Sequence, residues 1–240
     1  MTNLAWGKSI VHRFGKWYCK KICISEYQNQ TFRRINERPI EFRFLFHNLL
    51  HRCPRSILDV GTGTTALPHL MRNCGFLVTA TDNIIDYWTD GMFNRHYHII
   101  GDDITKSNIK GKFDFISCIS VLEHVSAFNN AIDCMTGLLD QEGHLILTFP
   151  YNEKKFINNI YKHQNAGYGQ DLPYICQVFS RKELDYWEQT YQLKIISQEY
   201  WQFFTGEYWT IGEQICPPKE VTKDALHQLT CIAFKKVVTT

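Results

Sequence analysis

Residues 57–65 read Ile-Leu-Asp-Val-Gly-Thr-Gly-Thr-Thr, a short apolar stretch that contains one acid and leads into two glycines one residue apart. Nineteen residues after Gly63, a second apolar stretch over 76–81 ends in Asp82. A strand that leads into a glycine-rich turn lets a ligand approach bare backbone, and an acid about twenty residues later can bind ribose hydroxyls. The two stretches together predict a nucleoside-binding site on an α/β sheet.

Two classes of cofactor use this geometry. Gly61, Gly63 and Ala66 satisfy the loose dinucleotide pattern G-x-G-x-x-G/A. Asp59, at the end of the first strand, argues against a dinucleotide, because a carboxylate repels a pyrophosphate and attracts a cation. S-adenosylmethionine carries an ammonium and a sulfonium group and no phosphate. Asp59 therefore favours S-adenosylmethionine over a dinucleotide.

The run 58–63 closely resembles the first motif of the class I S-adenosylmethionine-dependent methyltransferases, with Thr65 in place of the third glycine. Further stretches resemble the family's later strands and their ends, in the family's order: 79–83, 101–104, 113–118, 120–125 and 143–148. The resemblance covers about Ser56 to Pro150. The ordered set, more than any single motif, makes the chain similar to the small-molecule members of this family.

The resemblance implies a set of cofactor-binding residues. The acid after the second strand would hold the ribose, and an acid after the third strand would meet the adenine amino group. Asp102 and Asp103 both fit the second role, and we choose Asp103. The implied cofactor is S-adenosylmethionine, and its expected contacts are Asp59, Gly61, Gly63, Asp82, Asn83, Asp103, Ile104 and Ser120.

The order of strand and helix patterns predicts the fold class. From Ile57 to Phe149 the two patterns alternate, which is typical of a parallel sheet with right-handed crossovers. Residues 193–203 and 227–235 read as two strands with no helix-length apolar segment between them, so they should pair antiparallel. We expect an α/β fold: a Rossmann-like seven-stranded sheet, mostly parallel with an antiparallel C-terminal strand, helices on both faces and an N-terminal helical cap.

Two helices have clear sequence signals. Pro39 opens one that should run to Pro54, and Ser180 with Glu183 forms a capping start to another that ends near Tyr191. A chain of 240 residues suits one α/β domain. We expect a single methyltransferase domain over 1–240, divided into a helical cap (1–54), a cofactor-binding core (55–150), a substrate lid or insert (151–179) and a C-terminal helix with a strand pair (180–240).

The insert is a long polar segment that holds four tyrosines and directly follows a strand. Ligands bind beyond the carboxyl ends of strands in open α/β sheets, so a long segment there is often a lid or a substrate pocket. A disordered surface loop is the alternative. The expected substrate-binding residues are Tyr151, His163, Tyr168 and Asp171. His163 and Asp171 are also weaker candidates for a catalytic base, chosen by position alone.

His124 is the first candidate for a catalytic base. A base is needed only if the methyl acceptor is a hydroxyl or a protonated amine. The segment after the fourth strand adjoins the expected point of methyl transfer, and histidine titrates near neutral pH. A structural histidine that packs or caps a helix start is the alternative.

We expect no metal site. The nine cysteines form no C-x-x-C pair, which argues against zinc and favours reduced thiols in a cytoplasmic protein. Glu123-His124 resembles part of the acidic cluster in ubiquinone-pathway O-methyltransferases, whose further upstream glutamate is absent here. Neighbouring residues on a helix also point about 100° apart and do not chelate as a pair. His47 and His51 share a helical face, but no third ligand is evident.

Positive charge is concentrated near the N-terminus. Residues 1–43 carry nine Lys and Arg against three Glu, a net charge of +6 in a chain whose total is +2. A basic arm can contact nucleic acid or an anionic membrane, but these charges alternate with aromatic residues at helical spacing, which favours a solvated helical cap. No stretch approaches a membrane span in length. We expect neither nucleic acid nor membrane as a partner, and we leave the oligomeric state open, with a homodimer as one option.

The sequence therefore predicts an enzyme that transfers a methyl group from S-adenosylmethionine to a small molecule. The leading acceptor is a hydroxyl of a sugar-type or natural-product substrate, an interpretation that rests on resemblance alone. An N-methyltransferase of a small molecule is the alternative among enzymes. A catalytically silent subunit that binds S-adenosylmethionine and regulates or scaffolds a partner is the alternative from another class.

Overall fold

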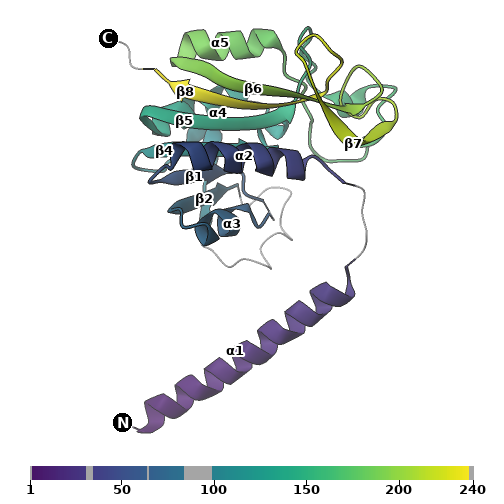
Figure 1. Ribbon diagram of the computed structural model, residues 1–240. Coiled ribbons are helices and arrows are strands. Elements are labelled where there is room, and N and C mark those ends of the chain that lie inside the picture. Colours follow the sequence, from purple (N-terminus) through teal and green to yellow (C-terminus); the bar gives the residue numbers. More distant parts are fainter. Residues whose placement is uncertain (1, 31–34, 64, 84–98, 238–240) are drawn as a thin grey trace. The chain divides into compact units, whose positions relative to one another are not determined.

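The computed structural model describes residues 2–30, 35–63, 65–83 and 99–237, which divide into two compact units. The first unit, Met1–Asn36, contains one helix, α1 (Thr2–Gln28). The second unit, Glu37–Thr240, contains the sheet and the remaining described elements (Figure 1). The predicted cap 1–54 therefore spans both units, because α2 (Arg38–Arg52) belongs to the second. The division of the chain into a cap, a core, an insert and a C-terminal part stays a prediction.

The second unit is built around one sheet with the strand order β3-β2-β1-β4-β5-β8-β6-β7 (Figure 1). The strands are β1 (Ile57–Val60), β2 (Val78–Asp82), β3 (Ile99–Gly101), β4 (Phe113–Ile119), β5 (Leu139–Pro150), β6 (Leu193–Phe204), β7 (Gln214–Val221) and β8 (Leu229–Lys236). Strands β1 to β5 pair in parallel, and β8 runs antiparallel to both β5 and β6. The predicted α/β class, the parallel core and the antiparallel pair at the C-terminus are confirmed.

The sheet holds eight strands among the described residues, one more than predicted. The additional strand, β7, lies at the edge and pairs antiparallel with β6. Its sequence contains Pro217 and Pro218, and proline weakens any strand pattern because it donates no backbone hydrogen bond. An edge strand tolerates proline, since one side of its backbone needs no partner strand. The strand number was therefore underestimated at the one place where the strand pattern is weakest.

Helices cover both faces of the sheet, so its central strands β1, β4 and β8 are buried on both sides. Helices α4 (Phe128–Leu138) and α5 (Arg181–Tyr191) contribute to one apolar cluster, and α2 and α3 (Leu67–Asn73) contribute to the other. Successive strand residues alternate between the clusters: Ile57 belongs to the α2 side and Leu58 to the α4 side. This two-sided burial explains why β1 reads as a continuous apolar run around a single acid.

The helix predicted from Pro39 to Pro54 is confirmed as α2. It begins at Arg38, with proline in its first turn, and ends at Arg52. Cys53 adopts a left-handed conformation, with φ at 45°, and its N–H donates to the Leu49 carbonyl, which closes the helix. The N-terminus of α2 lies beside the ends of β4 and β5, a position that matters for the site described below.

Helix α5 and the strands that follow it also match the prediction. The Glu183 carboxylate accepts hydrogen bonds from the N–H and the hydroxyl of Ser180, at 2.9 and 2.6 Å, which is the expected capping interaction. Strand β6 then pairs with β8 over most of its length. Residues 84–98, a part of the predicted alternation of strands and helices, lie outside the described residues.

The insert 151–179 leaves the sheet and returns to the same place. Tyr151 and Phe179 form an isolated β-bridge, and the Asn152 N–H donates to the Phe179 carbonyl at 2.9 Å. One short 3-10 turn, Ile160–Lys162, lies within the insert. The returning part of the insert packs against another 3-10 turn, η3 (Leu122–His124), through a hydrogen bond from the Gln177 N–H to the Glu123 carbonyl at 2.9 Å.

Candidate functional site

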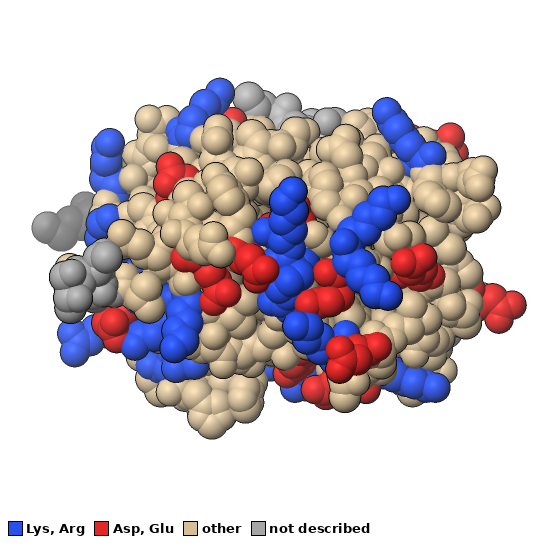
Figure 2. Space-filling model, turned by 90° about the horizontal axis from the view of Figure 1, so that it is seen from above, with Lys and Arg blue, Asp and Glu red and all other residues tan. Residues whose placement is uncertain are grey.

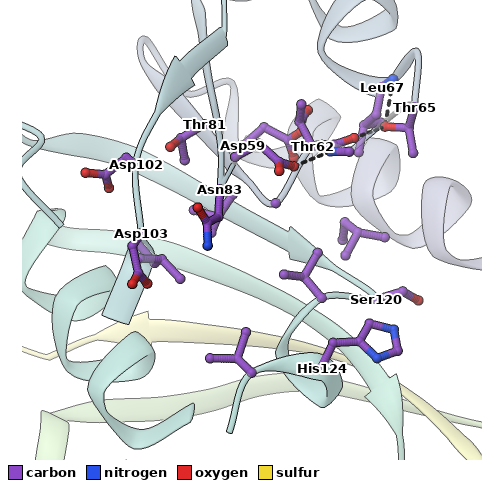
Figure 3. Close-up of a pocket in the computed structure, with 18 of the residues that line it drawn as sticks. Asp59, Thr62, Thr65, Leu67, Thr81, Asn83, Asp102, Asp103, Ser120 and His124 are labelled. Atoms are coloured by element: carbon purple, nitrogen blue, oxygen red, sulfur yellow. Dashed lines mark hydrogen bonds between the residues drawn. The ribbon is translucent and has the colours of Figure 1, made fainter. Parts of the chain in front are cut away.

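A cavity of about 340 Å³ lies at the carboxyl ends of β1, β2, β3 and β4, beside the start of α2. This volume is in the range of small-molecule sites. The cavity brings together all eight predicted cofactor residues and His124: Asp59, Gly61, Gly63, Asp82, Asn83, Asp103, Ile104, Ser120 and His124. In Figure 3, Asp102 and Asp103 lie on one side of the cavity, and Ser120 and His124 lie on the other.

The two glycines allow the turn after β1. Gly61 has φ at 70°, and a Cβ atom at this position would come within 2.5 Å of the Val121 side chain. Gly63 has φ at 53°, and its N–H donates to Asp82 Oδ2 at 2.5 Å. Left-handed backbone of this kind favours glycine. The G-x-G spacing therefore has a structural cause: the turn must pass under Val121 and then meet the acid at the end of β2.

Asp59 is buried at the base of the cavity with its carboxylate held in place. Its two oxygens accept hydrogen bonds from the Thr62 and Ser117 hydroxyls, both at 2.6 Å. Burial raises the pKa of Asp59 to about 6, although these two hydrogen bonds and the charge of Arg38 oppose the shift. The group is therefore mainly ionised at neutral pH, and a cationic ligand would stabilise that form further.

The two acids after β3 differ in their partners. Asp103 accepts hydrogen bonds from the N–H and the hydroxyl of Thr105, at 3.0 and 2.8 Å, and so caps a short 3-10 turn. Asp102 accepts from the Asn108 N–H through Oδ1, but its buried Oδ2 has no partner among the described residues. Both bonds from Thr105 go to Oδ1 of Asp103, whose side chain is 34% exposed, whereas Oδ2 of Asp102 is shielded from solvent and so from a ligand in the cavity.

A hydrogen-bond network links α2 to the ends of β4 and β5. The Glu41 side chain is fully buried, and its Oε1 accepts from the hydroxyls of Ser120 and Thr148 at 2.6 and 2.7 Å. Its Oε2 accepts from Arg38 Nη1 at 3.0 Å, and Arg38 also donates to the Ile119 carbonyl at 3.2 Å. Ser120 has φ at 49°, an unusual value for a residue other than glycine, and this network holds it there.

The cavity has more acidic than basic side chains. Four aspartates line it, together with one cation, Arg38, among the described residues. Burial pulls the pKa of Arg38 down, but the attraction of Glu41, Glu37 and Glu123 outweighs burial, so the pKa lies above its ordinary value and the guanidinium stays charged. Such a cavity repels a pyrophosphate and suits a ligand that carries positive charges and a single carboxylate.

His124 lies in η3 with its ring at the cavity wall. Its Nδ1 is 2.6 Å from the Ile175 carbonyl oxygen, which only accepts hydrogen bonds, so Nδ1 carries the proton and Nε2 has the lone pair. Burial, and to a smaller extent the charge of Arg38, lowers the pKa of His124, against the opposing effect of the hydrogen bond to Ile175. The ring is therefore neutral at neutral pH and can accept a proton at Nε2.

The four predicted substrate-binding residues do not line the cavity. Tyr151 is fully buried, and its hydroxyl donates to Glu153 at 2.8 Å beside the His227 ring. His163 accepts from the Asn165 N–H, and Tyr168 and Asp171 are exposed. Their role in binding a substrate stays a prediction without support from the cavity.

Among the cavity residues that the sequence did not identify are Arg38, Phe42 and Tyr174. Arg38 and Phe42 come from α2, where the apolar periodicity indicated packing alone. Tyr174 is the part of the insert that reaches the cavity, and its ring contacts the His124 ring edge-on, with 4.8 Å between centroids. The count of tyrosines in the insert was the only signal for Tyr174, and that count did not single it out.

The described residues give little support for a metal site, a membrane span or a nucleic-acid site. Among these residues, no group of three His, Cys, Asp or Glu side chains is arranged to hold a metal ion. The His47 and His51 rings contact each other edge-on, with 4.4 Å between their centroids. Within the part of the chain that the structure describes, no helix is both long and apolar enough to cross a membrane. The face drawn in Figure 2 intersperses Lys and Arg with Asp and Glu, without the continuous basic patch typical of a nucleic-acid site.

Solved structures with the same fold are numerous. A methyltransferase from Burkholderia thailandensis, described as a 1,6-didemethyltoxoflavin-N1-methyltransferase with bound S-adenosylhomocysteine, aligns over 99% of this chain and 92% of its own, with 13% identity and a TM-score of 0.56. An S-adenosylmethionine-dependent methyltransferase from Clostridium acetobutylicum aligns over 95% and 100%, with 14% identity and a TM-score of 0.53. The N-methyltransferase NodS from Bradyrhizobium japonicum aligns over 83% and 87%, with 15% identity and a TM-score of 0.50.

Sequence comparison shows the family. No curated protein matches the chain. The family model described as "Methyltransferase domain" matches residues 23–198, which is more than half of the chain and includes every residue of the cavity. The chain therefore belongs to the methyltransferase domain family, and its predicted resemblance to the class I S-adenosylmethionine-dependent methyltransferases is confirmed.

Proposed function

We propose that this S-adenosylmethionine-dependent methyltransferase methylates a hydroxyl group of a small molecule that binds beside His124. The observation that carries the proposal is the His124 ring: it lines the cavity, its Nδ1–H is committed to the Ile175 carbonyl, and its Nε2 has a lone pair. A neutral imidazole in this state accepts a proton, and a hydroxyl acceptor must lose one as its oxygen is methylated.

The charges of the cavity fit S-adenosylmethionine. Asp59 would face the ammonium end, and Asp82 would bind the ribose hydroxyls, as the glycine-rich turn and the acid after β2 imply. Arg38, clamped by Glu41 and by the Ile119 carbonyl, would bind the methionine carboxylate. When bound, S-adenosylmethionine supplies an electrophilic methyl group on its sulfonium centre.

The adenine contact stays with Asp103, the residue chosen from the sequence. Thr105 donates both its N–H and its hydroxyl to Oδ1 of Asp103, so Oδ2 can still accept, and the Asp103 side chain is 34% exposed. The partnerless Oδ2 of Asp102 is shielded from solvent, and therefore from a ligand in the cavity. An adenine amino group would donate to Oδ2 of Asp103.

The residues of this chain would then bind and orient the acceptor molecule and exclude water from the reacting groups. Phe42, Val125 and Tyr174 give the cavity apolar walls, and apolar walls keep water from the reacting groups. His124 would take the proton of the acceptor hydroxyl at Nε2. The lowered pKa of His124 keeps the ring in its proton-accepting form down to pH values below its ordinary pKa.

A sugar-type or natural-product acceptor stays a prediction from the sequence. N-methylation is the second candidate, and two of the similar structures, from Burkholderia and Bradyrhizobium, are described as N-methyltransferases. A neutral amine needs no base before it attacks, so the two candidates differ in their dependence on His124.

The experiment is His124→Ala, assayed as S-adenosylhomocysteine release from a metabolite extract whose methylated product is then identified. For a hydroxyl acceptor, turnover should fall by about 10²–10⁴-fold. The affinity for S-adenosylhomocysteine, measured by calorimetry, should be nearly unchanged. His51→Ala is the matched control, because His51 is exposed and does not line the cavity.

Near-normal turnover in His124→Ala would refute the role of His124 as a base. A product methylated on nitrogen would replace the hydroxyl acceptor by an amine. In the wild-type protein, turnover should fall on the acid side of a pKa below the ordinary value of histidine, because the protonated ring accepts no proton. His124→Ala should lose that inflection.

A further inference from the structure

The turn that carries His124 has little regular structure of its own. η3 is a 3-10 turn of three residues, and its internal backbone bonds run from the His124 N–H to the Val121 carbonyl and from the Val125 N–H to the Leu122 carbonyl. So short a turn leaves carbonyl groups without helical partners. The position of the His124 ring therefore depends on what binds these carbonyls from outside the turn.

One side chain of the insert binds them. Gln177 is 1% exposed, and its Nε2 lies 3.0 Å from the Val125 carbonyl, 3.3 Å from the Glu123 carbonyl and 3.5 Å from the Leu122 carbonyl. The Gln177 N–H adds a further bond to the Glu123 carbonyl at 2.9 Å. Burial of an amide is costly unless it is hydrogen-bonded; these carbonyls satisfy the NH₂ group of Gln177, whereas its Oε1 has no partner among the described residues.

The same short segment also holds the imidazole ring. The Ile175 carbonyl accepts from Nδ1 of His124, and the Tyr174 ring contacts the imidazole edge-on. Residues 174–177 thus fix both the backbone of the turn and the orientation and tautomer of the ring. These contacts join positions about fifty residues apart in the sequence.

We infer that Gln177 is a positioning residue of the reaction: by binding the carbonyls of the turn Leu122–Val125, its side-chain amide holds His124 with Nε2 turned toward the acceptor. This inference rests on the proposed role of His124 as the base. Gln177 itself does not line the cavity, so it acts through the turn and not through contact with substrate or cofactor.

The rate of the reaction depends on where the His124 ring lies. A displacement of about 1 Å in a catalytic group can cost about 10²-fold in rate, because the base must meet the acceptor hydroxyl at hydrogen-bond distance. Without the amide, the Val125 carbonyl would lose its donor, whereas the Leu122 and Glu123 carbonyls would keep their bonds from backbone N–H groups. The end of the turn would then rearrange so that the Val125 carbonyl reaches another donor or water. The ring would then leave the Ile175 carbonyl and become more exposed.

The test compares Gln177→Met and Gln177→Glu with Gln170→Met. Methionine keeps the length of the side chain and removes the donor, and glutamate keeps its shape and one oxygen. Gln170 is an exposed glutamine of the same insert, so its replacement controls for the substitution. Release of S-adenosylhomocysteine from the same metabolite extract should fall by about 10- to 100-fold in both Gln177 variants, with calorimetric affinity for S-adenosylhomocysteine within about twofold.

A second readout reports on the ring directly. NMR titration of the His124 ring should place its pKa below the ordinary value in the wild-type protein and nearer that value in Gln177→Met, because the ring loses part of its burial. The groups that face the ring are Glu123, whose Oε1 is 3.9 Å from Nε2, Arg38 from α2, and Tyr174. None of these is altered by the substitution.

A double-mutant cycle separates this inference from the proposed function. If Gln177 acts through His124, Gln177→Met should cause no further loss of turnover in a His124→Ala background. An equal loss in both backgrounds would overturn the positioning role and leave the base role intact, whereas full activity of His124→Ala would remove the base role itself. Absence of a cooperative thermal transition in both Gln177 variants would show that the amide serves folding alone and would also overturn the inference.

Discussion

Glu41 offers a sharp test of how the site is built, because one buried carboxylate joins the cavity cation to two strand ends. The perturbation is Glu41→Gln. The amide oxygen of glutamine can still accept from the hydroxyls of Ser120 and Thr148, as Oε1 does. The amide NH₂ group would replace Oε2 and would face Nη1 of Arg38, so two donors would meet where a charged hydrogen bond now stands.

The expected magnitude follows from the burial of the pair. A hydrogen bond to a charged group contributes about 1.5–3 kcal/mol. Removal of one partner from a fully buried pair costs about 3–5 kcal/mol, but the Arg38 side chain is 29% exposed, and water can satisfy part of it. We therefore expect a loss of about 2 kcal/mol in unfolding free energy, which corresponds to a Tm lower by about 4–8 °C in a protein of this size.

Glu41→Gln should also lower the affinity for the cofactor, because Glu41 holds the Arg38 guanidinium that we propose binds the methionine carboxylate. Calorimetry with S-adenosylhomocysteine should show binding about 10-fold weaker, equivalent to about 1.4 kcal/mol. Glu213→Gln is the control, since Glu213 is exposed and does not line the cavity. A lower Tm with unchanged affinity would refute the assignment of Arg38 to the cofactor. An unchanged Tm would refute the reasoning about the network itself.

Two further predictions concern the acids of the cavity. Asp82→Ala should weaken S-adenosylhomocysteine binding by about 1.5–3 kcal/mol in calorimetry, and NAD should bind negligibly to the wild-type protein; comparable affinity for NAD would contradict the cofactor assignment. Asp103→Ala should weaken S-adenosylhomocysteine binding several-fold and lower the Tm through loss of a cap worth about 1 kcal/mol, whereas Asp102→Ala should leave the affinity nearly unchanged. The opposite order of affinity losses would assign the adenine contact to Asp102.

Local sequence patterns predicted those turns, helices and site residues that depend on residues close to them in the sequence. The turn after β1 needs left-handed backbone at Gly61 and Gly63, and glycine at that spacing is visible in the sequence. Helix α5 begins at a capping pair only three residues apart. The acids after β2 and β3 were also found, because strand ends in a parallel sheet meet at one edge.

Patterns of this kind failed where the signal was weak or misleading. Strand β7 was missed, because two prolines interrupt its pattern, and only its pairing with β6 makes it a strand. Tyr151 and His163 were chosen for their place after a strand end; the insert turns back on itself and neither residue lines the cavity, so their role in substrate binding stays a prediction. Position along the chain does not say which way a loop folds.

The sequence by itself determined the parallel core of the sheet, the cofactor class and the acids along one edge of the cavity, because each follows from spacing within a few residues or from the order of strands. Only the tertiary structure decided which side chains complete the site. Glu41 meets Thr148 across 107 residues, and Gln177 meets Val125 across 52. Such contacts leave no periodic trace in the sequence, since they depend on how α2 and the insert pack against the strand ends.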